Sequence, residues 1–260
     1  LIMIFEKKSL RTRISFELAI KQLGGELLIL NPNDSHYGSG NESIKDTAKV
    51  ISQYGDIVMM RTQKHKNFLK FKKNLDIPII NGLTNLSHPC QIMADVMTFE
   101  ELKGPIKNKK VAWLGDGNNI VYSLIEAAVK FDFKLTIASP KKFRPDKKIL
   151  KWAKNKNAKI LVTKNPKEAA RLADCVMTDK WISMGDKSNK KKKRKLLKPY
   201  QVNKKIMKLA KPDAIFMHCL PASRGDEVTD EVIDGKQYAV LQEALNRIHV
   251  QKSILEWCLK

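Results

Sequence analysis

The stretch SLRTR, residues 9–13, combines hydroxyl and cationic side chains between an apolar run and an amphipathic pattern. This order places two hydroxyls and an arginine at the start of a predicted helix, where free backbone N–H groups and the helix dipole favour an anion. An arginine adds two parallel hydrogen-bond donors that match a phosphate. Plain N-capping by Ser9 or Thr12, with solvated arginines, explains the same pattern. Arg61 ends another apolar run, and its position favours the phosphate interpretation.

Polar side chains of a different kind follow apolar runs in the C-terminal half. Asn119 lies in WLGDGNN, Asp179 follows CVMT, and Cys219 lies in MHCLPA. A carboxylate accepts from an ammonium group, whereas an amide accepts or donates, so this set suits an amino acid as ligand. A helix-capping or turn role explains Asp179 equally well. His218 and Cys219 adjoin at a strand end, where neighbouring side chains point to opposite faces, so we expect neither an activating pair nor a covalent nucleophile.

The elements that must position these residues are visible as apolar runs that alternate with helical stripes. One predicted helix carries Phe16, Ala19, Ile20 and Leu23 on one face, and another begins at Pro89. The alternation indicates the α/β class, with mainly parallel sheets flanked by helices. Ligands of such sheets bind beyond the carboxyl ends of the strands, where the residues above fall. Strands are predicted at residues 1–5, 27–30, 57–60, 77–80, 111–114, 135–138, 160–162, 175–178 and 214–217.

The length of 260 residues allows two modest domains. Apolar residues are sparse at 103–110, and we place the boundary there. The prediction is therefore a first domain over residues 1–102 and a second over residues 109–235.

Charge and cysteine content narrow the classes of function. The net charge is +22, but the lysines are spread along the chain and are not interleaved with aromatic residues, as a base-stacking platform requires. Only residues 187–198, KSNKKKKRKLLK, form a dense block, which we interpret as a solvated loop, with anion or nucleic-acid binding as the alternative. The apolar runs are too short to cross a membrane. Four cysteines without a C-x-x-C pair suit free thiols in a reducing, cytoplasmic compartment.

The residue spacing does not match a structural zinc site or a complete dinucleotide-binding motif. His88, Cys90, His218 and Cys219 do not have the separations of a structural zinc site, so we expect no metal. WLGDGNN contains G-x-G without the third glycine, and no acidic residue follows the strand at 135–138 to bind a ribose hydroxyl. Ser139 with Lys141 leaves a 2′-phosphate as the remaining dinucleotide interpretation. Our expectation is that the protein uses no cofactor.

The chain resembles the ornithine carbamoyltransferases of the aspartate/ornithine transcarbamylase family. The S-x-R-T-R and H-P-x-Q segments are shared by transcarbamylases in general, whereas D-G-N-N, D-x-W-x-S-M-G and H-C-L-P point to ornithine as the acceptor. The resemblance covers nearly the whole chain, and it implies that the C-terminal helix, residues 243–260, completes the first domain. It rests on six segments in the family's order, namely FEKKSLRTRISFE, HPCQIMAD, WLGDGNN, TDKWISMG, MHCLPA and ALNRIHVQKSIL.

The resemblance implies an enzyme that moves the carbamoyl group of carbamoyl phosphate to the side-chain amine of L-ornithine. The products are L-citrulline and phosphate, in arginine biosynthesis, the urea cycle or arginine catabolism. The family is typically built on trimers, and His36 matches a residue that reaches a neighbouring subunit's phosphate. Cys219 would lie beside the reacting amine, with Asp179, Arg61 and His88 completing the catalytic set. Carbamoyl phosphate would contact Ser9, Leu10, Arg11, Thr12, Arg61, His88, Gln91, Leu220 and Arg247, and ornithine would contact Asn119, Asp179, Ser183 and Met184.

Three positions depart from the family's usual pattern. Leu10 stands where Thr is usual, Lys8 where Pro is usual, and Leu245 where Glu is usual. The first change removes a hydroxyl from the phosphate site, and the last bears on the position of Arg247. Two alternatives stay open, a transcarbamylase with another amine acceptor such as putrescine, and a non-catalytic basic protein of this fold that binds nucleic acid through residues 187–198.

Overall fold

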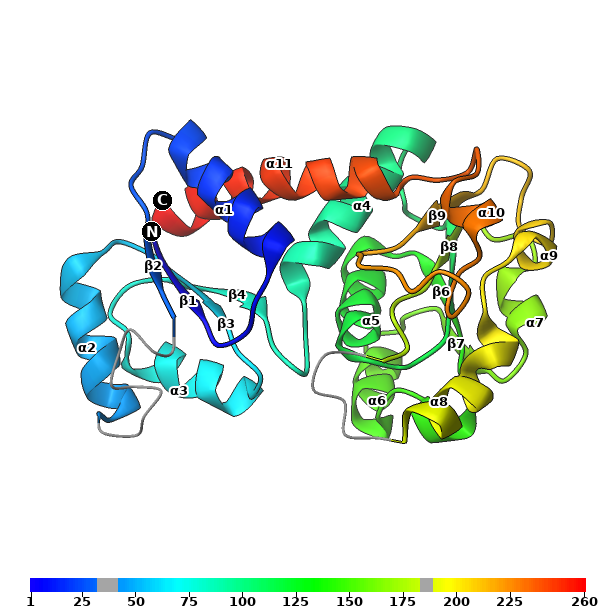
Figure 1. The fold of residues 1–260 in the computed structure, drawn as a ribbon, viewed down its shortest axis with the longest axis horizontal. Helices are drawn as coiled ribbons and strands as arrows, with labels where there is room; N and C mark the ends of the chain where they lie inside the picture. The colour runs from blue at the N-terminus through cyan, green and yellow to red at the C-terminus, as the bar shows by residue number, and fades with distance from the viewer. Residues whose placement is uncertain (32–41, 183–188) are drawn as a thin grey trace. The chain divides into compact units, whose positions relative to one another are not determined.

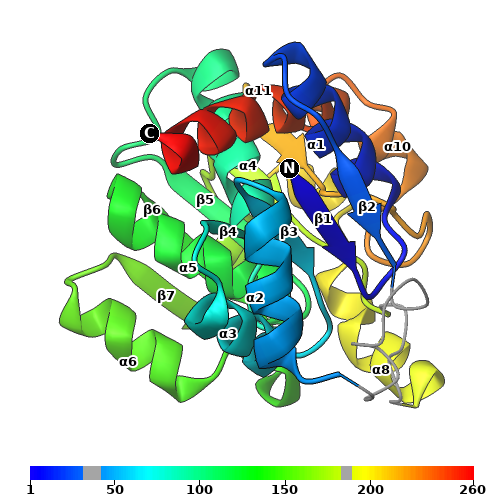
Figure 2. The same cartoon turned by 90° about the vertical axis from the view of Figure 1, so that its left-hand side faces the viewer.

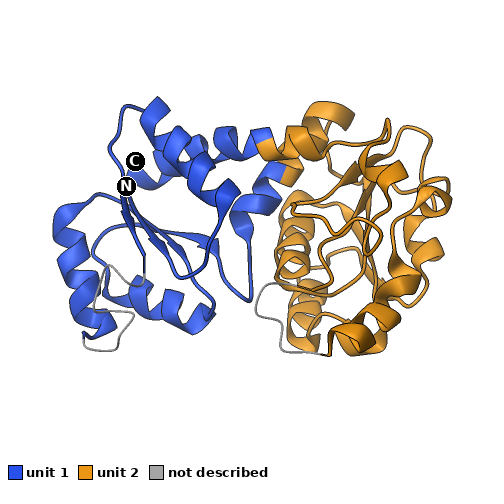
Figure 3. Ribbon diagram, in the orientation of Figure 1, with its two compact units in different colours: residues 1–94, 245–260 blue, residues 95–244 orange. Residues whose placement is uncertain are grey.

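The computed structural model describes residues 1–31, 42–182 and 189–260, drawn as a ribbon in Figure 1. These residues fold into two compact units, residues 1–94 with 245–260, and residues 95–244 (Figure 3). Each unit contains one parallel sheet. Within the described residues, no helix combines the length and the apolar character needed to span a bilayer.

The sheet of the first unit has the order β2-β1-β3-β4, and its neighbouring strands are parallel. α11 contributes residues 245–259 to this unit, and α4 contributes its first turns. The elements are β1 (Ile2–Phe5), α1 (Leu10–Gln22), β2 (Leu28–Leu30), α2 (Ile44–Tyr54), β3 (Val58–Arg61), α3 (His65–Asn74), β4 (Ile79–Leu83), α4 (Pro89–Lys103) and α11 (Val240–Leu259).

Successive side chains of β1 point to opposite faces of this sheet and so belong to two different cores. Met3 packs with Phe16 of α1 and Leu255 of α11. Ile4 packs on the other face with α2 and with Phe71 of α3. Both views show α1 and α11 side by side, away from α2 and α3 (Figures 1 and 2). Helices therefore cover both faces of the sheet.

The sheet of the second unit has the order β7-β6-β5-β8-β9, again with parallel neighbours. Leu114 of β5 and Phe216 of β9 pack on one face with residues of α7, α9 and α10. The elements are β5 (Lys110–Leu114), α5 (Asn119–Phe131), β6 (Lys134–Ala138), the 3-10 turn η2 (Lys141–Phe143), α6 (Lys147–Asn155), β7 (Ile160–Thr163), α7 (Pro166–Ala170), β8 (Cys175–Met177), α8 (Lys190–Leu197), the 3-10 turn η3 (Lys198–Tyr200), α9 (Lys204–Met207), β9 (Ile215–Met217) and α10 (Asp230–Ile233).

The predicted fold class is confirmed, because both sheets are parallel and flanked by helices. The interpretation of residues 187–198 as a loop is wrong for its described part, since residues 190–197 form α8. Lysine is a good helix former, and the side chain of Asn189 caps α8 by accepting the N–H of Lys192 at 3.1 Å. The fully buried Leu197 anchors the end of this helix.

Candidate active site

The first turn of α1 presents the SLRTR residues beyond the carboxyl end of β1. Ser9, rather than Thr12, is the N-cap, and its hydroxyl accepts the N–H of Thr12 at 3.3 Å. Thr12 itself is buried, Arg11 is half-buried, and Leu10 is 69% exposed. The start of α1 is therefore capped by the side chain of Ser9.

Two arginines that are distant in the sequence converge on the hydroxyl of Thr12. Nη1 of Arg61, the last residue of β3, donates to Thr12 Oγ1 at 3.1 Å, and Nη2 of Arg247 on α11 donates to the same oxygen at 3.3 Å. Nη1 of Arg247 also donates to Oε1 of Gln91 at 2.7 Å. A threonine oxygen has two acceptor positions, and these two hydrogen bonds use both. The predicted residues Thr12, Arg61, Gln91 and Arg247 thus form one cluster.

His88, which immediately precedes α4, is buried next to this cluster. Burial lowers the pKa of its imidazole well below the usual range, and the charges of Arg247, Arg61 and Arg11 lower it further. The ring is therefore neutral at physiological pH. A neutral imidazole can donate one hydrogen bond without adding another positive charge beside three guanidinium groups.

These side chains give the first unit the groups that an anion-binding site requires. Arg11, Arg61 and Arg247 all act electrostatically on His88, and the start of α1 adds the partial positive charge of a helix N-terminus. One guanidinium group can donate two parallel hydrogen bonds to the oxygens of a phosphate. A phosphate group with a small neutral substituent fits this combination of cations, helix start and neutral imidazole.

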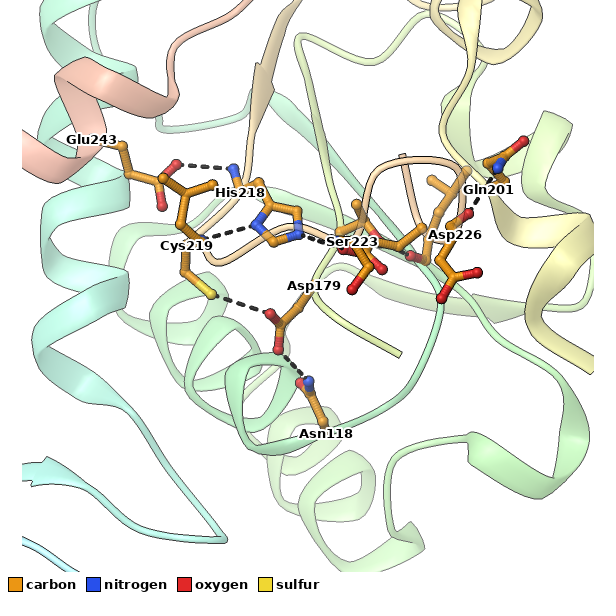
Figure 4. Close-up of polar contacts among 12 residues, drawn as sticks. Asn118, Asp179, Gln201, His218, Cys219, Ser223, Asp226 and Glu243 are labelled. Atoms are coloured by element: carbon orange, nitrogen blue, oxygen red, sulfur yellow. Dashed lines mark hydrogen bonds and ion pairs between the residues drawn. The ribbon is translucent and has the colours of Figure 1, made fainter. Parts of the chain in front are cut away.

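The second unit brings a carboxylate and a thiol together at neighbouring strand ends. β8 and β9 are parallel, with Met177 paired to Met217. Asp179 and Cys219 each follow two residues later, and Cys219 Sγ donates to Asp179 Oδ1 at 3.3 Å (Figure 4). Burial raises the pKa of the Cys219 thiol well above its usual range, and the charge of Asp179 raises it further. The thiol therefore stays protonated and acts as a hydrogen-bond donor.

Asn118 donates to the other oxygen of this carboxylate, whereas the sequence assigns a ligand contact only to its neighbour Asn119. Asn118 Nδ2 donates to Asp179 Oδ2 at 2.6 Å (Figure 4). Its Oδ1 caps α5 by accepting the N–H groups of Ile120 and Val121. An asparagine directly before a helical stripe is the usual N-cap signal, and this signal could have identified the residue. Asn119 is the first residue of α5.

His218 supports the strand end rather than the thiol. Its Nδ1 accepts the N–H of Leu220 at 2.9 Å, and its Nε2 lies 3.5 Å from Glu227 Oε1. The backbone N–H of His218 donates to Glu243 Oε2 at 2.9 Å. The ring of His218 thus contacts Leu220 and Glu227, whereas the thiol of Cys219 donates to Asp179. Leu220 adopts φ +54° and begins the turn that follows.

Asp179, His218 and Cys219 are close enough to be considered as metal ligands, because one ligand atom from each lies within 4.8 Å of the others. Both Sγ of Cys219 and Nδ1 of His218 already take part in the hydrogen bonds described above. We therefore assign these three side chains to a hydrogen-bonded group rather than to a metal site.

Three predicted site residues, His36, Ser183 and Met184, lie outside the described residues.

Comparison with known protein families matches both parts of the chain. Residues 1–101 match the carbamoyl-P binding domain of aspartate/ornithine carbamoyltransferase, and residues 107–258 match the Asp/Orn binding domain. The chain belongs to the aspartate/ornithine carbamoyltransferase family.

Known carbamoyltransferases resemble this chain along its whole length. The ornithine carbamoyltransferase of Rhodopseudomonas palustris CGA009 is 55% identical over 259 residues, which are 100% of this chain and 83% of the relative. The solved ornithine carbamoyltransferase of Pyrococcus furiosus matches with a TM-score of 0.93 and 45% identity, covering 98% of this chain and 82% of that one. The anabolic ornithine carbamoyltransferase of Campylobacter jejuni also matches with a TM-score of 0.93, at 40% identity, covering 99% and 86%.

Two departures from the carbamoyltransferase pattern can now be placed. Leu245 is 49% exposed, whereas Arg247 two residues later is held by Gln91 and Thr12. These two hydrogen bonds help to fix the position of Arg247. Leu10, the first residue of α1, exposes its side chain beside the N-cap, so the missing hydroxyl changes the polarity of the helix start without disturbing the core.

Proposed function

We propose that this chain is an ornithine carbamoyltransferase, which transfers the carbamoyl group of carbamoyl phosphate to the side-chain amine of L-ornithine. The observation that carries the proposal is that each half of the chain has side chains suited to the ligand of the domain that it matches. The cation cluster on Thr12 lies in the part of the chain that matches a carbamoyl-P binding domain. The Asp179–Cys219 pair lies in the part that matches an Asp/Orn binding domain. Each half thus has the charge that its substrate requires.

Residue roles follow from the chemistry of each group. Arg11, Arg61 and Thr12, with the N–H groups at the start of α1, bind the phosphate. His88, Gln91, Arg247 and the backbone of Leu220 contact the carbamoyl group. Asp179 and Cys219 contact the side-chain amine of ornithine, which binds in its neutral form, and Asn119, Ser183 and Met184 bind the rest of the amino acid. The capping hydroxyl of Ser9 completes the phosphate site.

The reaction forms one bond and breaks one. The neutral side-chain amine attacks the carbamoyl carbon, and negative charge develops on the carbonyl oxygen. Arg61 and the neutral His88 stabilise that oxygen, because preorganised donors act most strongly where charge develops. The C–O bond to phosphate then breaks, and Arg11 stabilises the departing anion. We assign the proton lost by the amine to Asp179, whose orientation is set by Asn118 and Cys219. No electrons are exchanged with a redox partner.

A citrulline assay of the purified chain tests this proposal. Ornithine, putrescine, aspartate and N-acetylornithine are compared at equal concentration with saturating carbamoyl phosphate. We expect product from ornithine alone, and a preference for another amine would overturn the ornithine assignment.

The site assignment is tested by Arg61→Ala, with Arg13→Ala as the matched control. Arg61 donates to Thr12, whereas Arg13 is exposed on α1 of the same unit. We expect Arg61→Ala to abolish citrulline formation and Arg13→Ala to keep it. An Arg61→Ala enzyme with the wild-type rate would show that the phosphate binds elsewhere.

We also propose that the enzyme is a cytoplasmic homotrimer in which His36 reaches the phosphate of a neighbouring subunit. The proposal rests on the family's usual assembly. One chain has a mass of 29.7 kDa. Light scattering of the purified protein should give three times this mass. A His36→Ala variant should remain trimeric and bind carbamoyl phosphate more weakly. A monomer with full activity would contradict both the trimer and the role of His36 in a neighbouring subunit.

A further inference from the structure

The basic residues of α8 do not share one environment. Lys190, Lys191 and Lys192 are exposed to solvent. Lys193 is only 9% exposed, and the fully buried Leu197 follows four residues later on the same helix face. One lysine of the block is therefore directed into the protein, although lysines are rarely buried unless they are paired.

Lys193 is paired with a carboxylate and covered by an aromatic ring. Its Nζ lies 2.6 Å from Asp116 Oδ2, and both side chains are largely buried, with exposures of 10% and 17%. The same ammonium group lies 5.3 Å from the centroid of the Phe143 ring, within the range of a cation–π contact. A buried ion pair is costly to break, because the remaining partner keeps an uncompensated charge.

Asp116 opens the D-G-N-N loop that follows β5, and this loop has little freedom. The backbone oxygen of Asp116 accepts the indole N–H of Trp113 at 3.0 Å. The N–H of Gly117 donates to the backbone oxygen of Phe143 at 2.7 Å. A Cβ at Gly117 would lie 2.6 Å from that oxygen and 2.6 Å from the nitrogen of Pro145. The loop is thus packed against the segment that also supplies the ring over Lys193.

The next residue of the same loop is Asn118, which donates to Asp179 at 2.6 Å. Asp179 in turn accepts from Cys219. We propose that Lys193 is a positioning residue that holds the D-G-N-N loop through Asp116 and thereby sets the orientation of Asn118 and Asp179 toward the acceptor amine. This inference rests on the proposed function, since it concerns the acceptor half of that site.

The test compares two neighbouring lysines of α8. Lys193→Met removes the charge but keeps most of the buried stem, and Lys192→Met makes the same change at an exposed position. We expect Lys193→Met to raise the KM for ornithine about tenfold and to leave the KM for carbamoyl phosphate unchanged. Lys192→Met should leave both constants unchanged. Lys193→Arg, which preserves the charge, should restore most of the affinity for ornithine.

Asp116→Asn provides a second variant that preserves the side-chain shape and should raise the same KM. KM does not depend on the fraction of enzyme that is folded, so a lower kcat with an unchanged KM for ornithine in both variants would indicate a purely structural role and overturn the inference. Equal constants for Lys193→Met and the wild type would overturn it as well.

A readout without turnover separates this inference from the proposed function. The alkylation rate of Cys219 reports the Asp179–Cys219 contact whether or not citrulline forms. If the wild type makes no citrulline, the proposed function fails. The positioning role still predicts a changed alkylation rate in Lys193→Met and an unchanged rate in Lys192→Met. Equal rates in both variants would reject the positioning role.

Discussion

Arg247 donates a 2.7 Å hydrogen bond to Gln91 across 156 residues of sequence, joining α11 to the first turn of α4. Both side chains are 2% exposed. The amide oxygen thus helps to compensate a buried charge, and the guanidinium group keeps a fixed direction in which its other nitrogen reaches Thr12. The Arg247–Gln91 contact therefore contributes to the stability of the fold and also orients a residue of the proposed carbamoyl phosphate site.

Loss of the Gln91 acceptor should destabilise the protein measurably. Gln91→Leu keeps a similar volume and removes the oxygen, so we expect the free energy of unfolding to fall by about 2 kcal/mol, as for a hydrogen bond to a charged group. Urea denaturation followed by circular dichroism measures the change. Gln22→Leu, at an exposed position of α1, serves as the control and should have little effect. Equal stabilities of the two variants would contradict a contribution from the Arg247–Gln91 contact.

His88 should make stability depend on pH in a defined direction. Its pKa in the folded protein is below the ordinary value of 6.5, so the unfolded chain binds the proton more tightly. The free energy of unfolding therefore decreases as the pH falls below 6.5 and continues to decrease toward the lowered pKa. His88→Gln lacks this titration, and its stability difference from the wild type should shrink between pH 7.5 and pH 5.5. The same urea measurements at both values test this, with exposed His249→Gln as the control. A difference that stays constant would mean that His88 does not titrate in this way.

Cys219 should react slowly with iodoacetamide despite its position at a strand end. Burial and the charge of Asp179 keep the thiol protonated, and only the thiolate is alkylated, so we expect a rate at least about tenfold below that of glutathione at pH 7.5. Asp179→Asn removes the negative charge and should accelerate the reaction. Asp226→Asn changes a carboxylate that pairs with Arg194 instead and should have no effect. Peptide mass spectrometry identifies the modified cysteine, and rapid labelling of Cys219 in the wild type would refute the prediction.

Leu10→Thr should strengthen the binding of carbamoyl phosphate. Leu10 is 69% exposed at the first position of α1, so the change adds a hydroxyl at little cost to the core. We expect the affinity to rise about fivefold, the ratio given by one hydrogen bond of about 1 kcal/mol. Ile14→Thr makes a comparable change one turn later, at a position 46% exposed, and should not alter binding. Calorimetric titration of both variants measures the difference, and equal affinities would show that the hydroxyl does not reach the ligand.

The sequence was sufficient to predict the strands of both sheets, although β4 (Ile79–Leu83) begins and ends later than the predicted range 77–80. Runs such as LIMIF and IVMM are continuous apolar stretches, and the corresponding residues of β1 and β3 are buried on both faces, as parallel strands covered by helices require. Helix α3 was not predicted, because its apolar stripe is short and is interrupted by lysines at residues 64–73. The helical state of residues 190–197 was also missed, because a charge run alone does not reveal which residue turns inward.

The candidate site could be predicted by residue type but not by contact. The positions of Arg61 and Asp179 follow from strand ends in a parallel sheet. The convergence of Arg61 and Arg247 on one hydroxyl depends on the packing of α11 against the first unit, and no local pattern encodes this. Asn118 was overlooked in favour of Asn119 because both amides follow β5, and only the helix start distinguishes them.

The pairing of Met177 with Met217 bears on how this protein can change in length. Asp179 and Cys219 lie at equal offsets from this pair, so their contact depends on strand register and on two residues at each strand end. The number of residues in the connection between β8 and β9 does not enter this relation. One residue inserted directly after Met177 or Met217 would shift one partner and separate the thiol from the carboxylate. An insertion in an exposed turn of the connection, such as residues 212–213, leaves the register unchanged. Tolerance to insertion should therefore change abruptly at the strand ends.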